Sequence, residues 1–105
     1  MSNELDGGEI IHQCVGTLER GDGMHDVSCK SLLQVSDDVC SILTSMESGR
    51  KIISTRQAEY GRMYKNKDFR PEHLRVIYKL YGNKIVDAYL DGQLNCDNPK
   101  LICGL

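Results

Sequence analysis

The sequence lacks any long apolar run. A helix that crosses a membrane needs about 20 predominantly apolar residues, and no segment of the 105-residue chain approaches that length. Residues 1–8 are acidic and polar, whereas a secretory signal begins with basic residues followed by apolar ones. Internal repeats and low-complexity stretches are also absent. These absences predict a protein without membrane attachment, located inside the cell in the cytoplasm or the nucleus.

The motifs of common enzymes are missing as well. The chain has no nucleophile elbow of the form G-x-S-x-G, no H-E-x-x-H zinc motif and no glycine-rich phosphate loop. The adjacent acids Asp37 and Asp38 diverge by about 100° on a helix, so they do not form a carboxylate dyad. The sequence therefore predicts a protein without enzymatic activity and without a cofactor.

Cysteine occurs five times but never in a tight pair. The odd count and the missing signal favour reduced thiols over a disulfide framework. The residues that offer metal ligands are His25 with Cys29, four positions apart, to which His12 with Cys14 or Cys96 with Cys103 could add. None has the C-x-x-C spacing typical of structural zinc. The sequence therefore predicts no metal site.

Charge of one sign is scarce in each part of the chain, although the net charge of the whole is only −2. Residues 1–48 contain two Lys or Arg and nine Asp or Glu, a net charge of −7. Residues 49–84 contain ten Lys or Arg and three Asp or Glu, a net charge of +7, and residues 85–105 carry −2. Such segregation predicts either a basic surface exposed to an anionic partner or an acidic half folded onto a basic segment.

Helical periodicity dominates the sequence, and no segment shows the alternation expected of a half-buried strand. We expect one all-α domain over residues 1–105, a compact bundle of four or five helices with an irregular C-terminal tail. Within it, residues 1–48 form an acidic helical half, 49–84 a basic helical segment, and 85–105 the end of the last helix and the tail.

Start and stop signals divide this domain into its expected helices. The first is expected over residues 8–20, the second from an N-cap at Asp26 to Ser48, and the third over 55–66. The pair Ser54 and Gln57 resembles the capping box that opens such a helix. Pro71 suits the first position of a fourth helix, and Gly82 with Asn83 favours a break in it before residue 90.

The cleanest apolar stripe lies on the second expected helix, at spacings of 3, 4, 3 and 4 residues. Its members are Leu32, Val35, Val39, Ile42 and Met46. A stripe of this kind either packs into the core of a bundle or forms the seam of a homodimer. The sequence leaves both interpretations open.

The basic segment is the strongest candidate for function. Six of its cations are expected to contact phosphates: Arg56, Arg62, Lys65, Lys67, Arg75 and Lys79. Tyrosines interleave with them, and a phenol can stack on a base or donate to a phosphate. The leading hypothesis is a small dimeric protein that binds the backbone of DNA or RNA. The alternatives are an adaptor or inhibitor that binds an acidic protein, and internal neutralisation of the basic segment by the acidic half.

Overall fold

The computed structural model describes residues 7–57, 63–96 and 100–105. Three α-helices lie in these residues: α1 (Met24–Glu47), α2 (Pro71–Tyr81) and α3 (Ile85–Leu90). A short 3-10 helix, η1 (Asn66–Asp68), precedes α2. Long extended segments connect them, and the described residues contain no strand longer than an isolated bridge. The all-α class is therefore confirmed, but the predicted number of four or five helices is wrong.

Helix α1 forms where the apolar stripe predicted a helix. Gly23 is its N-cap, and the Asp26 carboxylate accepts the backbone N–H of Gly23 at 2.7 Å. Asp26 was predicted to be the N-cap itself, but it lies three residues further on, where it can bond back to an orphan donor. The helix ends at Ser48, and Gly49 follows in the left-handed region with φ of 84°. The predicted stop is confirmed.

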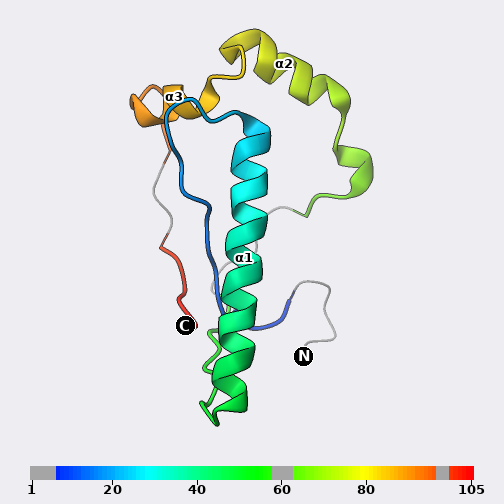
Figure 1. Cartoon of the computed structure of the whole chain (residues 1–105). Helices are drawn as coiled ribbons and strands as arrows, with labels where there is room; N and C mark the ends of the chain where they lie inside the picture. Colours follow the sequence, from blue (N-terminus) through cyan, green and yellow to red (C-terminus); the bar gives the residue numbers. More distant parts are fainter. Residues whose placement is uncertain (1–6, 58–62, 97–99) are drawn as a thin grey trace.

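The helix predicted over residues 8–20 is wrong. This segment is extended and runs beside α1 in the opposite direction (Figure 1). Its burial alternates: even-numbered residues from Ile10 to Leu18 are partly buried, and the odd-numbered residues between them are exposed. Gly16 permits the close approach, because a Cβ at this position would lie 2.9 Å from Ser31 Oγ on α1.

Two further extended segments lie against this one. Ile10 and Thr55 exchange backbone hydrogen bonds of 2.8 Å, and Gln13 donates its N–H to the Ile102 carbonyl at 2.8 Å. The predicted capping residues join the same contact: Ser54 donates to the Glu9 carboxylate, and Gln57 donates to a carbonyl of the N-terminal segment.

The helix predicted over residues 55–66 is not formed in its described flanks. Residues 55–57 and 63–65 are non-helical, and residues 58–62 lie outside the described residues. The side chains predicted to cap it are engaged with the N-terminal segment instead, so they do not open a helix.

Helices α2 and α3 follow the predicted signals closely. Pro71 is the first residue of α2, and Glu72 lies in the first turn, where the helix dipole favours an acid. Gly82 and Asn83 both adopt positive φ, 55° and 63°, and this ends α2 at Tyr81. The predicted break is confirmed. The described part of the tail is irregular, as predicted, and it packs beside residues 11–13.

The hydrophobic core is small. Val86 and Ala88 of α3 are the buried hydrophobic residues of the described chain, at the end where α1 begins. The accessible surface of the chain is 9160 Å², whereas a compact monomer of this mass exposes about 5,900 Å². Its radius of gyration is 16.8 Å, against about 13 Å for a compact domain of this length. The chain is elongated and open rather than the compact bundle that was predicted.

The described helices include none whose length and apolar content would suit a membrane span.

Candidate nucleic-acid interface

The predicted phosphate-binding cations occupy three separate places in the fold. Arg56 lies in the extended segment that follows α1, next to the bridging residue Thr55. Lys65 and Lys67 lie at η1, and Arg75 and Lys79 lie on α2. These five are all exposed, and Arg62 lies outside the described residues. The structure therefore places the described cations at the surface, distributed over several elements rather than on two neighbouring helices.

The η1 turn is held by its own polar groups. The Asp68 carboxylate accepts the backbone N–H of Lys65 at 2.8 Å, and the Phe69 N–H donates to the Asn66 carbonyl at 3.3 Å. These bonds use backbone atoms and the Asp68 side chain, and the ammonium groups of Lys65 and Lys67 take part in no ion pair among the described residues. Residues 63–73 are exposed throughout.

Helix α2 exposes both cations and apolar side chains. Leu74, Ile77 and Tyr81 are its partly buried residues, and they recur at helical spacing on the side that faces the rest of the chain. Arg75 and Lys79 are four residues apart and therefore share one exposed face. Like charges at this spacing repel each other by a few tenths of a kcal/mol in an isolated helix, so an anion bound at this face would relieve that repulsion.

The ion pairs of the described residues do not involve the basic segment. Lys30 binds Glu19 at 3.2 Å and Asp22 at 2.8 Å, and Arg20 binds Asp91. These pairs neutralise the acidic half with its own cations or join it to the end of α3. Among residues 50–57 and 63–84, no Lys or Arg forms an ion pair with a described acid.

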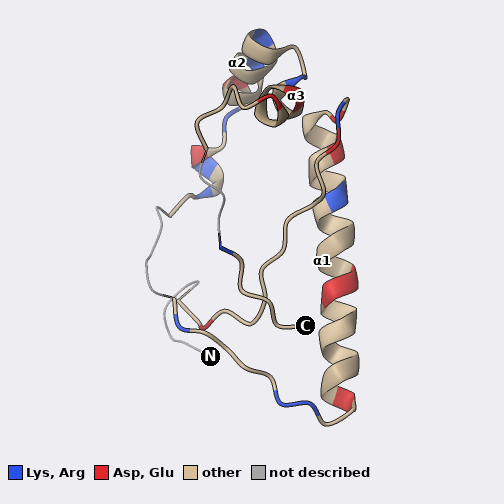
Figure 2. Ribbon diagram, turned by 90° about the vertical axis from the view of Figure 1, so that its left-hand side faces the viewer, with Lys and Arg blue, Asp and Glu red and all other residues tan. Residues whose placement is uncertain are grey.

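Figure 2 shows the same separation in space. The Lys and Arg residues of η1 and α2 lie on elements away from α1, which carries several of the acids. Internal neutralisation requires ion pairs between the acids of the first half and the cations of the basic segment. The described part of the chain shows no such ion pair.

Most of the predicted dimer stripe is exposed on α1, and Val39 and Ile42 line a groove with residues 9–13. Four of its members, Leu32, Val35, Val39 and Met46, are between 43% and 67% exposed. Ile42 is partly buried, because it lies at the edge of the stripe beside residues 10–13. The described chain therefore does not bury this stripe in its own core.

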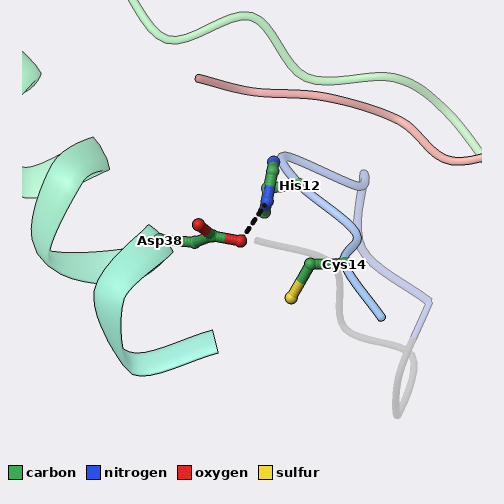
Figure 3. Close-up of side chains that lie close together, drawn as sticks. All are labelled: His12, Cys14 and Asp38. Atoms are coloured by element: carbon green, nitrogen blue, oxygen red, sulfur yellow. Dashed lines mark hydrogen bonds and ion pairs between the residues drawn. The ribbon is translucent and has the colours of Figure 1, made fainter. Parts of the chain in front are cut away.

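The structure brings together one cluster that sequence reasoning recognised only in part. His12 Nε2 lies 2.9 Å from Asp38 Oδ2, and Cys14 lies beside both (Figure 3). The side chains of His12 and Asp38 are only 11% and 8% exposed. The sequence offers His12 with Cys14 as ligands, but it relates Asp38 only to its neighbour Asp37. The separation of 26 residues between His12 and Asp38 leaves no local signal that joins them.

Hydrogen bonds join the residues of this cluster to one another and to the C-terminal tail. The Gly104 N–H donates to His12 Nδ1 at 2.9 Å, so the ring proton lies on Nε2 and points at Asp38. The hydrogen bond from His12 holds the pKa of Asp38 below its ordinary value, and Gln34 adds a second bond at 2.9 Å. Burial and the neighbouring Asp38 carboxylate raise the pKa of the Cys14 thiol.

The cluster is not arranged as a nucleophilic triad. Both ring nitrogens of His12 are already engaged, one with Asp38 and one with Gly104, so neither is free to accept the Cys14 proton. A thiol with a raised pKa is also a poor nucleophile.

Comparison of the chain with models of known protein families, with curated proteins and with solved structures found no match. A functional argument therefore depends on the residues and their geometry alone.

Proposed function

We propose that this protein is a small non-enzymatic nucleic-acid-binding protein that contacts the phosphate backbone through residues 50–84 and acts as a homodimer. The observation that supports this most directly is that the cations described in this segment have no ion-pair partner among the described acids. The described cations of this segment are exposed and form no ion pair with the described acids. Phosphates would supply the missing negative charge.

The placement of these cations also favours an external anion. Arg70 is the N-cap of α2, where the positive end of the helix dipole makes a cation unfavourable. Arg75 and Lys79 add like charges on the same helix. An anion bound near them would offset both effects, and a polyanion such as a duplex would do so along the whole segment.

The dimer rests on surface that a single copy does not bury. The accessible area of 9160 Å² exceeds that of a compact monomer by about 3,200 Å². Obligate dimers typically bury about 2,000 Å² or more in total, or about 1,000 Å² per copy, so such an interface would cover about a third of this excess. The stripe from Leu32 to Met46 is uncharged and about 21 Å long, and we assign the dimer interface to it.

Salt dependence of oligonucleotide binding tests the nucleic-acid proposal. The full chain is titrated with random-sequence duplex and single-stranded oligonucleotides at several salt concentrations, with fluorescence anisotropy as the readout. Six phosphate contacts per copy give a slope of log affinity against log salt of about −5 on duplex. Millimolar affinity at low salt would refute the proposal.

A charge-reversal pair separates specific contacts from net charge. Lys79→Glu is expected to weaken duplex binding about tenfold and to reduce the salt slope by about one. Lys100→Glu makes the same change of charge at an exposed position outside the basic segment, and it is expected to weaken binding less than twofold. Equal effects of the two substitutions would mean that residues 50–84 form no particular interface.

A second candidate function is binding to an acidic protein partner. Val76 and Leu80 are exposed on α2 next to Arg75 and Lys79, and an apolar strip beside cations suits an amphipathic acidic segment better than a phosphate backbone. If oligonucleotides bind weakly and without salt dependence, this candidate replaces the first.

A further inference from the structure

The Asp38 carboxylate is a buried negative charge without a cation beside it. His12 and Gln34 donate hydrogen bonds to it at 2.9 Å each. His12 is the neutral tautomer, because its Nδ1 accepts the Gly104 N–H. No Lys or Arg of the described chain forms an ion pair with Asp38. A buried carboxylate with neutral partners only is costly, and a bound cation would remove that cost.

We propose that His12, Cys14 and Asp38 form a binding site for a divalent transition-metal ion, of which zinc is the best match. The three side chains offer one nitrogen, one sulfur and one oxygen ligand, all within 4.8 Å of one another. Zinc prefers this mixture of donors, at about 2.0–2.3 Å from each. Small side-chain movements would therefore bring all three onto one ion.

The local backbone explains why these residues converge. His12 and Cys14 are two residues apart in an extended segment, so their side chains point to the same side. Asp38 faces them from α1, and Gly16 allows the segment to approach the helix closely. Three protein ligands leave the fourth tetrahedral position to water. The site thus joins two elements that are far apart in the sequence.

Coordination requires two proton movements. The Cys14 thiol releases its proton to water, and the thiolate sulfur bonds to the metal. His12 Nε2 must give up its proton to coordinate, so the ring proton moves to Nδ1. There it opposes the Gly104 N–H, which can no longer donate to the ring. One zinc ion, one thiolate and one carboxylate then sum to zero charge.

Metal binding is therefore expected to have two consequences beyond occupancy. It stabilises the packing of residues 10–18 on α1, in a chain with few buried apolar residues. It also breaks the hydrogen bond that holds residue 104 of the C-terminal tail on His12, so hydrogen exchange at the Gly104 amide should become faster when zinc is added.

Metal titration of the full chain tests the site. The protein is freed of metal with a chelator and titrated with zinc and with cobalt, and the readouts are calorimetry, the thiolate-to-cobalt absorption band and thermal unfolding. We expect one ion per chain, a cobalt band from a single thiolate, and a rise in melting temperature of several degrees with zinc.

Two variants distinguish this site from binding by surface cysteines. A chain with Ser at the four exposed cysteines keeps the site and should bind as the unmodified chain does. Cys14→Ser should lose the cobalt band and weaken zinc binding at least 30-fold. The cysteines replaced in the first variant are Cys29, Cys40, Cys96 and Cys103.

Several outcomes would overturn the proposal. They are loss of binding in the four-cysteine variant, retained binding in Cys14→Ser, and zinc affinity no better than millimolar in the unmodified chain. If Cys14→Ser does not fold, the four-cysteine variant still decides the question, because Cys14 is then the sole thiol that could produce the cobalt band.

Discussion

Replacing Val39 by Asp places a charge in the middle of the α1 stripe. Val39 is 49% exposed in the single chain, so a carboxylate at this position would still reach water there. In a two-fold dimer that pairs the stripes, each copy would bury its carboxylate in the interface. The substitution therefore acts differently on folding and on association.

The two effects differ enough to be measured separately. In the single chain, Val39→Asp loses about half the burial of a valine side chain, or about 1 kcal/mol. In the dimer, an unpaired buried charge costs about 3–5 kcal/mol. One such carboxylate, at about 4 kcal/mol, would already weaken association by a factor of about 1,000, and a two-fold dimer contains two of them. The variant should therefore be a folded monomer at concentrations where the unmodified chain is a dimer.

Light scattering and sedimentation at two concentrations give the oligomeric state, and circular dichroism gives the folded fraction. Val15→Asp is the matched control, because Val15 is 61% exposed on the extended segment and is not a member of the stripe. It should remain dimeric. The reasoning fails if the unmodified chain is monomeric at both concentrations, or if the two variants dissociate equally. It also fails if Val39→Asp unfolds while Val15→Asp does not.

Two further predictions concern the fold. Gly16→Ala places a Cβ 2.9 Å from Ser31 Oγ, so the free energy of unfolding, measured by urea denaturation, should fall by about 1–3 kcal/mol. Gly8→Ala is the control: open space surrounds Gly8, so the free energy of unfolding should change little. The hydrogen bond from Lys30 lowers the pKa of Asp22 in the folded chain. The contact between Lys30 and Asp22 therefore stabilises the fold fully above the ordinary pKa of a carboxyl group, and its contribution is lost as the pH falls through the lowered pKa of Asp22. Between about pH 5 and pH 2, urea unfolding of Asp22→Asn should depend less on pH than that of the unmodified chain, and equal pH dependence would contradict this assignment.

Local signals predicted the helices whose ends are set by nearby residues. Pro71 at the start of α2, the pair Gly82 and Asn83 at its end, and Gly49 after α1 each act through the backbone within one turn. These ends could be predicted because the physical cause and the affected residue lie together in the sequence.

The extended N-terminal segment could not be predicted in this way. Its apolar residues fit a helical period, and the alternation is hidden because two of the inward positions are His12 and Gly16. A histidine that binds Asp38 and a glycine that contacts α1 carry no apolar signal. Tertiary contacts with α1 therefore decide the conformation of this segment, and these contacts are not visible in local sequence.

The difference between local signals and distant contacts also explains which site residues could be predicted from the sequence. The exposure of Lys65 and Lys79 follows from their charge and their local positions, although the sequence left open whether the acidic half covers them. The approach of Asp38 to His12 depends on the packing of two distant segments, so sequence reasoning placed Asp38 only on a helix.

The proposed dimer stripe and the proposed anion-binding cations lie on different elements, and this bears on how the two would act together. The stripe lies on α1, whereas the described cations lie on the segment after it, on η1 and on α2 (Figure 2). Pairing two copies through α1 would leave both basic segments exposed. A duplex bound by one copy would then meet the second at a high effective concentration, which raises affinity without any new contact.

A chain with a small core and a modest number of cations gains most from such pairing, because each copy alone offers few phosphate contacts. The apolar stripe and the unpaired charge, which are each unfavourable in a single copy, are compatible with one dimeric binding protein.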